Sequence, residues 1–111
     1  MTIQYKSEVF NLTTTNLTTV LTIAVSAVAI VKTVQAVHDT ASNVDTHLVL
    51  KKFGGSDTKI SYEELNKSTS DMLKNTLNLE AGDVIKMQAG TANQITGVVS
   101  YALIDRSQEN G

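Results

Sequence analysis

The stretch LNLEAGDVIKMQAGTANQITGVVSYALI, residues 77–104, decides the fold of this chain. Two turn signals divide it, Glu80-Ala81-Gly82-Asp83 and Gly90-Thr91-Ala92-Asn93. Glycine adopts positive φ at little steric cost, and Asp or Asn closes a turn through its own side chain. The three pieces around these turns, 77–79, 84–89 and 95–104, are rich in Val and Ile, which fit a pleated surface. The stretch therefore predicts three strands of an antiparallel β-structure.

The first half of the chain continues this β pattern. Leu21, Ile23 and Val25 alternate with smaller or polar residues, which is the period of a strand, and Ser26-Ala27 is the predicted turn after it. Residues 29–38, AIVKTVQAVH, carry apolar groups on both faces, as a central strand does.

We place Ile30, Val34 and Ala36 on one face of that central strand. Residues 44–51 then alternate between apolar and polar side chains and indicate a half-buried strand. Gly-Gly-Ser-Asp at 54–57 predicts a hairpin-like turn after it.

Residues 61–77 leave two interpretations open. Ser61-Tyr62-Glu63-Glu64 fits the start of a helix. The alternative is a strand at 59–64, a polar loop at 66–70 and a second strand at 72–79. We favour the strands, because the segments on both sides are β.

Together, these predicted strands indicate an all-β fold, an antiparallel β-sandwich of about eight short strands with either a jelly-roll or an immunoglobulin-like topology. Its length of 111 residues predicts one domain, residues 1–111. Within it, residues 1–12 are an N-terminal arm or an edge strand, and residues 106–111 form a frayed polar tail.

Composition narrows the function classes. Thr, Val and Ile make up 34 of the 111 residues, and there is no Cys, Pro or Trp. A net charge of −2 argues against a nucleic-acid partner, which usually meets a basic patch. The uncharged run 9–31 contains too many Thr and Asn residues for a membrane span. We therefore expect no nucleic acid and no membrane among the partners.

Residues able to carry catalysis do not form a recognisable set. His38, Asp39, Asp45 and His47 are close in sequence and offer zinc-binding side chains, as in a small cupin-like enzyme. Such a site needs further ligands from another strand, so we interpret both histidines as surface or interface residues. No Ser stands in a Gly-x-Ser-x-Gly elbow and no phosphate loop is present. We predict no catalytic residue, no metal, no cofactor and no enzymatic activity.

Two segments carry a resemblance to a known group of proteins. The pattern Leu77-x-Leu-Glu-Ala-Gly-Asp-x-Ile-Lys-x-Gln-Ala-Gly-Thr-Ala-Asn, followed by Val98-Val99-Ser100-Tyr101, resembles small virion proteins of tailed bacteriophages. Ile30-Val31-Lys32-Thr33-Val34 resembles a second stretch of these proteins, V-K-S/T-I/V. The resemblance is closest to proteins from phages of marine bacteria and cyanobacteria. The chain departs from the group at His38, where Asn is common, and at Gly90-Thr91, where Ser-Ala is usual.

The resemblance implies a β-sandwich structural protein of the virion, most like a capsid decoration (cement) protein. Such a protein would be made in the host cytoplasm and would stabilise the head from the capsid surface by binding the major capsid protein, as a homo-oligomer and preferably a trimer. The alternative is a tail-fibre or host-surface module that binds glycan. In either case an N-terminal arm would pair with a neighbour, and we predict Ile3, Tyr5, Val9 and Phe10 as its partner-binding residues.

Overall fold

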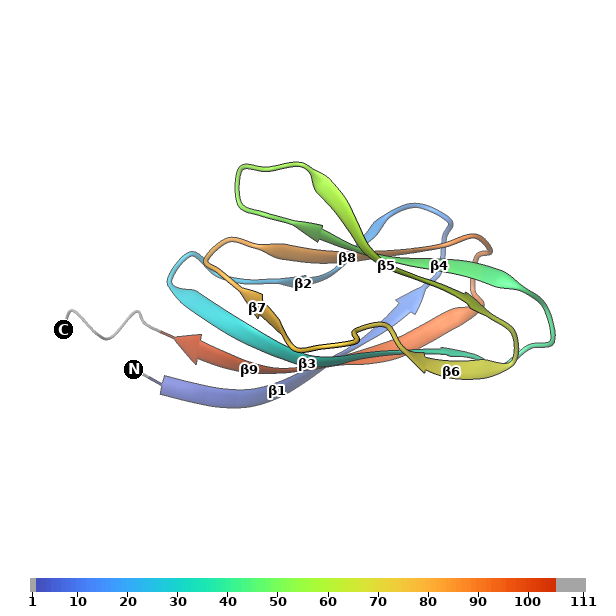
Figure 1. Ribbon diagram of the computed structural model, residues 1–111, viewed down its shortest axis with the longest axis horizontal. Coiled ribbons are helices and arrows are strands. Elements are labelled where there is room, and N and C mark those ends of the chain that lie inside the picture. The colour runs from blue at the N-terminus through green and yellow to red at the C-terminus, as the bar shows by residue number, and fades with distance from the viewer. Residues whose placement is uncertain (1, 106–111) are drawn as a thin grey trace.

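The computed structural model describes residues 2–105, which form two antiparallel sheets packed face to face (Figure 1). The nine strands are β1 (Thr2–Leu12), β2 (Thr18–Thr22), β3 (Ala27–His38), β4 (Val44–Lys51), β5 (Asp57–Leu65), β6 (Ser68–Asp71), β7 (Leu77–Leu79), β8 (Val84–Ala89) and β9 (Ile95–Asp105). The predicted all-β sandwich is confirmed. Over these residues, no helix has the length and apolar character that a membrane span requires. The predicted tail at 106–111 lies outside the described residues.

The strand order decides between the two predicted topologies. The first sheet has the order β1-β9-β3-β6, with β7 also paired to β3, and the second has the order β2-β8-β4-β5. The chain therefore pairs from its ends inward: β1 with β9, β2 with β8, β3 with β6 and β7, and β4 with β5. If β6 and β7 count as one interrupted strand, this is an eight-stranded jelly roll.

Residues 77–104 fold into the three predicted strands β7, β8 and β9, the last of which runs one residue further, to Asp105. Their two turns cross between the sheets, because β7 and β9 belong to the first sheet and β8 to the second. Gly82 has a φ of 81°, which explains the glycine in the first of these turns.

The predicted faces of β3 need a correction. The pairing of β3 with β9 shifts between Val31 and Thr33, so Lys32 is an extra residue, a β-bulge. Val31 and Val34 consequently both face the core, whereas Ile30 lies on the outer face. Simple alternation across residues 29–38 placed Ile30 and Val34 together, which is wrong.

The boundaries predicted for residues 57–79 are also partly wrong. Strands are present and a helix is not, but the expected loop at 66–70 contains most of β6, and of the strand expected at 72–79 only β7 forms. Asp71 ends β6, because its carboxylate accepts hydrogen bonds from the backbone amides of Val34 (3.3 Å) and Leu73 (3.0 Å). The turn predicted at Ser26-Ala27 lies one residue earlier, since the amide of Ala27 bonds the carbonyl of Ala24 (3.1 Å) and Ala27 begins β3.

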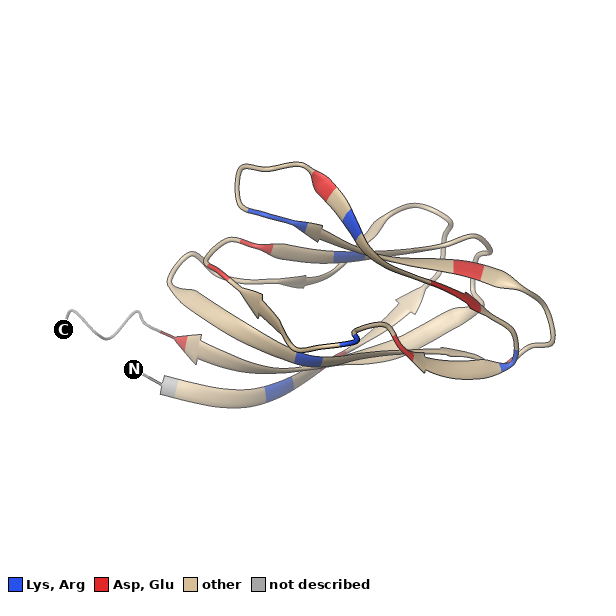
Figure 2. Cartoon of the chain, in the orientation of Figure 1, with Lys and Arg blue, Asp and Glu red and all other residues tan. Residues whose placement is uncertain are grey.

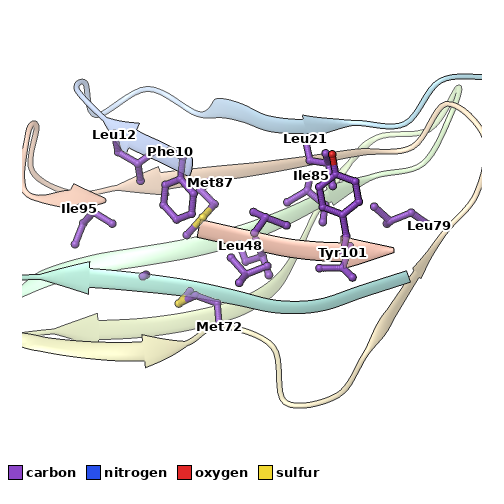
Figure 3. Close-up of a cluster of buried hydrophobic side chains, with 14 of the residues drawn as sticks. Phe10, Leu12, Leu21, Leu48, Met72, Leu79, Ile85, Met87, Ile95 and Tyr101 are labelled. Carbon is purple, nitrogen blue, oxygen red and sulfur yellow. The ribbon is translucent and has the colours of Figure 1, made fainter. Parts of the chain in front are cut away.

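The core between the sheets is aliphatic, with Met72, Met87, Phe10 and Tyr101 among the Leu, Ile and Val side chains (Figure 3). Phe10 packs directly over Gly97 of β9. A Cβ atom on Gly97 would lie 1.9 Å from the carbonyl oxygen of Gln35 and 2.5 Å from Cζ of Phe10. Only glycine fits there, so this position joins β1, β9 and β3 closely.

Candidate functional site: two unlike outer faces

The outer face of the first sheet carries apolar side chains on β1, β9 and β3, on both sides of a polar middle formed by Ser7, Ser100 and Thr33. Residues directly opposite each other in antiparallel strands share a face, so the register places Ile3 beside Ile104, Tyr5 beside Ala102, and Val9 beside Val98. Ile3, Tyr5 and Val9 are 53%, 78% and 83% exposed. We call the surface made by Ile3, Tyr5, Val9, Val98, Ile104 and Ile30 the apolar face.

One charge lies over the apolar face. The Nζ atom of Lys32, projecting from the bulge in β3, is 5.1 Å from the centre of the Tyr5 ring. An ammonium group over an aromatic ring at this distance is a cation–π contact. The bulge thus brings a cation to the apolar face without interrupting the pairing of β1 with β9.

The sequence predicted Ile3, Tyr5, Val9 and Phe10 together, and the structure groups only the first three. Phe10 has the opposite parity along β1 and is buried in the core against Gly97. Its placement with the partner-binding residues is therefore corrected. Partner binding by Ile3, Tyr5 and Val9 stays a prediction.

β1 forms one edge of the first sheet. It pairs with β9 over its whole length, from Thr2 opposite Asp105 to Leu12 opposite Ile95, without a register shift. The side of β1 that points away from β9 has no strand beside it in the described part of the chain. A regular edge of this kind offers backbone N–H and C=O groups to another strand.

The outer face of the second sheet is charged: Figure 2 shows charged residues along β4, β5 and β8, and the strand register places most of them on this face. Strand pairing places the following residues on this face: Asp45, His47, Lys51, Asp57, Lys59, Tyr62, Glu64, Lys86 and Gln88. Lys86 and Asp57 form an ion pair across it (2.9 Å). We call this surface the charged face.

A hollow of about 300 Å³ lies on the charged face, lined by Thr15, Asp45, His47, Gln88, Ala89 and Gly90. The Tyr62 hydroxyl donates a hydrogen bond to Asp45 Oδ1 (2.9 Å), and its ring lies 5.1 Å from the His47 ring. This hydrogen bond, with some burial and the charge of Glu64, raises the pKa of Tyr62 above its usual 10.0. His47 Nδ1 is buried without a hydrogen-bond partner.

Sequence reasoning found only part of this hollow. The spacing of Asp45 and His47 placed them on one face of a strand, as observed. The other lining residues come from the β1–β2 connection and from β8, which only the jelly-roll pairing brings together. Of the other predicted metal-ligand candidates, His38 is buried, not at the surface, and its Nε2 bonds the carbonyl of Ser42 (2.7 Å). Within residues 2–105 no group of three His, Asp or Glu side chains is arranged to hold a metal.

Asp83, in the turn between β7 and β8, has a structural role. Its buried carboxylate accepts hydrogen bonds from the amides of Glu80 (2.8 Å) and Phe53 (3.1 Å) and from Lys52. Burial by itself would raise the pKa of Asp83, but the hydrogen bonds from Lys52, Glu80 and Phe53 outweigh it and lower the pKa below 3.8. Glu80, Gly82 and Asp83 thus form the predicted tight connection between two strands. The structure adds that Asp83 ties this connection to the β4–β5 turn.

Comparison with known proteins shows the fold. The chain matches no family model and no curated protein. It is similar to a chain of the acidic stable capsid structure of Helicobacter pylori bacteriophage KHP30, with a TM-score of 0.59 and 14% identity over 96% of this chain and 90% of that one.

Two further solved structures are similar. One comes from Bacillus endospore appendages, a family of disulfide-linked pili (TM-score 0.51, 15% identity, 95% of this chain and 88% of that chain). The other is from the Gx strain of infectious bursal disease virus (TM-score 0.50, 8% identity, 95% of this chain and 34% of that chain). At these identities the likeness establishes a shared β-sandwich fold.

Proposed function

We propose that this protein is a non-enzymatic structural protein of a phage virion, and that it decorates the capsid surface and stabilises the head by binding major capsid subunits. The observation that carries the proposal is the apolar face. An outer sheet face in contact with water is normally polar, so a row of exposed apolar side chains marks a surface that a partner covers.

Two further observations support it. The fold is one that occurs in a phage capsid structure and in a second virus structure. The patterns at residues 30–34 and 77–93 resemble small virion proteins of phages that infect marine bacteria and cyanobacteria. The protein would then be made in the host cytoplasm and added to the shell.

The energetics of the apolar face suit such a contact. Fully burying a side chain such as Val9 or Ile3 contributes roughly 1.5–3 kcal/mol. A few such residues at the centre of a contact commonly supply most of its affinity. Lys32 beside Tyr5 adds a cation that suits an acidic group at the rim of the partner's surface.

The test mixes the purified protein with mature capsids that lack it and measures the bound fraction after pelleting. We expect saturation at a fixed ratio to the major capsid protein. Tyr5→Ser should weaken binding about tenfold or more, because it removes the most prominent ring of the apolar face. Tyr62→Ser, the matched variant on the charged face, should bind like the native protein. Failure of the native protein to reach a fixed ratio contradicts the proposal.

A second function is favoured by the hollow on the charged face, namely a tail-fibre or host-surface module that binds glycan. Asp45, Gln88 and His47 offer hydrogen-bonding groups around a hollow of about 300 Å³, next to the half-exposed ring of Tyr62. Sites for small ligands commonly combine a hollow with a few convergent polar groups.

The same tyrosine pair separates the two functions. Specific retention on a glycan array that is lost in Tyr62→Ser and kept in Tyr5→Ser would favour the glycan-binding module. No retention of the native protein on any glycan would remove this alternative and leave the capsid proposal untouched.

A further inference from the structure

β1 differs from the other sheet edges. It pairs with β9 over eleven residues without a bulge. β2 has five residues and a register shift, and β6 and β7 have four and three. β5 is longer but has a bulge and four charged residues, two of which, Asp57 and Glu63, already form ion pairs. β1 is thus the one long, regular edge in the described part of the chain.

The middle of β1, YKSEV at residues 5–9, is complementary to itself when reversed about Ser7, whereas the outer pairs, such as Ile3 with Asn11, are not. In an antiparallel pair of two copies centred on Ser7, Lys6 lies opposite Glu8 of the second copy, and Glu8 opposite its Lys6. On the apolar face, Tyr5 lies opposite Val9 of the second copy, and Val9 opposite its Tyr5. Opposite charges and aromatic–β-branched pairs directly across two strands are both favourable.

Neighbouring registers lack this match. A shift of one residue in the pairing would put the apolar side chains of one copy, Tyr5 and Val9, on the core side of the other copy. Centring the pair on Lys6 or on Glu8 keeps the faces matched but sets Lys6 against Lys6 or Glu8 against Glu8, and like charges directly opposite are unfavourable. These two centres also leave two residues of each β1 unpaired, whereas the pair centred on Ser7 uses all eleven.

Charges on an edge strand often serve to prevent pairing. Lys6 and Glu8 lie on the core side of β1, are exposed, and form no ion pair within residues 2–105. The carboxylate of Glu8 does interact with the Tyr101 hydroxyl of its own chain, which leaves its negative charge in place. Because they have opposite sign and stand two residues apart, they oppose pairing centred on either of them and favour pairing centred on Ser7. The charges therefore select one partner, a second copy of this chain.

We propose that two copies of this protein associate through an antiparallel β1–β1 pair centred on Ser7, which joins their first sheets into one continuous sheet. The contact is two-fold, so by itself it yields a dimer and not the trimer that the family resemblance implies. It also brings two apolar faces side by side on one surface. The contact needs no capsid, so it stands or falls independently of the proposed function.

The first test exchanges the two charges in the purified full chain and measures the mass by sedimentation equilibrium. The native protein is expected to be a dimer. Lys6→Glu should raise the dissociation constant roughly tenfold or more, since both cross-strand ion pairs become repulsive pairs. The double variant Lys6→Glu/Glu8→Lys should restore the native value. Thermal melting of each variant checks that the fold persists, which matters because Glu8 lies near the buried Tyr101.

The second test reads the register with single cysteines, which the chain otherwise lacks. Directly opposite residues lie at Cα distances of roughly 4.5–5.5 Å, which suit a disulfide. Ser7→Cys should therefore cross-link under mild oxidation much faster than Lys6→Cys or Glu8→Cys. Faster cross-linking at residue 6 or 8 overturns the register. A monomeric native protein, a trimer unaffected by Lys6→Glu, or a double variant as weak as Lys6→Glu overturns the proposal as a whole.

Discussion

The two sheets of this sandwich share one core but differ on their outer faces. Both bury Leu, Ile, Val and Met side chains inward. Outward, the first sheet shows Ile3, Tyr5 and Val9, whereas the second shows Asp45, Lys59 and Lys86 among other charged residues (Figure 2). The core that stabilises the fold is formed by the inward-facing side chains of each sheet. Under the proposed function, this outward difference reflects what each face meets: water on the charged face and a partner on the apolar face.

The edges repeat this contrast. β5, at the edge of the second sheet, has a bulge, and its charges Asp57 and Glu63 are paired within the chain. β1, at the edge of the first sheet, is regular, and its charges Lys6 and Glu8 lie on the core side of the strand, exposed to solvent and without an ion pair in the described part of the chain. A bulged, charged edge resists pairing, whereas a regular edge with balanced charges permits it in one register.

The largest effect is expected from Gly97→Ala, which breaks the first sheet. The new methyl group would overlap the carbonyl of Gln35 and the ring of Phe10. We expect a loss of roughly 3 kcal/mol or more in the free energy of unfolding, measured by urea denaturation. Gly90→Ala is the control, since a Cβ there meets its nearest neighbour at 3.7 Å. Equal effects of the two substitutions would contradict the close packing of β1, β9 and β3.

The next effect is expected from Asp83→Asn, which weakens the end of the second sheet. Loss of the charged hydrogen-bond acceptor for Lys52, Phe53 and Glu80 should cost roughly 2 kcal/mol at neutral pH. Asp57→Asn, which removes an exposed ion pair, should have little effect.

This cost of Asp83→Asn should depend on pH in one direction. The folded pKa of Asp83 lies below its usual 3.8, so its carboxylate stabilises the fold fully above about pH 5, and the contribution is lost as the pH falls through the folded pKa. Urea denaturation of both proteins between neutral pH and acid should show their difference shrinking. A difference that grows on acidification would contradict the assigned network.

A smaller effect is expected from Lys32→Met, which makes the apolar face wholly uncharged. The cation–π contact with Tyr5 is exposed, so its loss should change the free energy of unfolding by only about 0.5 kcal/mol. Lys32→Arg should keep the contact and the native stability. A change of several kcal/mol in Lys32→Met would show that Lys32 has another role in the bulge.

The smallest effect on stability is expected from Asp45→Asn, which tests the hydrogen bond between Tyr62 and Asp45 on the charged face. Without the carboxylate that accepts its hydrogen bond, the pKa of Tyr62 should fall toward its usual 10.0. A titration followed by NMR of the Tyr62 ring measures it, with Asp71→Asn as a distant control. An unchanged pKa of Tyr62 would contradict the hydrogen bond to Asp45.

The sequence predicted the fold class and most strands because Val and Ile runs alternate with Gly and Asn turns, most clearly at residues 77–104. It missed the bulge at Lys32, which arises from the pairing of β3 with β9 and not from the residues of β3 alone. It also misplaced the break between β6 and β7, which depends on Asp71 bonding the backbone of β3. Both features are long-range, and local propensity does not contain them.

The sequence likewise predicted only part of the candidate site. Ile3, Tyr5 and Val9 share one period along the strand, and the same period places Phe10 on the opposite face. The structure adds that the glycine at position 97 makes room for the Phe10 ring in the core. The hollow around Asp45 and His47 combines residues from three segments of the chain, and only the jelly-roll pairing assembles them.

In the proposed function, the apolar face is the surface that meets the capsid. Electron cryo-microscopy of capsids saturated with the protein tests it most directly. We expect Ile3, Tyr5 and Val9 to lie buried against the major capsid protein, with β5 and the charged face turned away from the shell. A reconstruction with the charged face against the shell and the apolar face in solvent would contradict it.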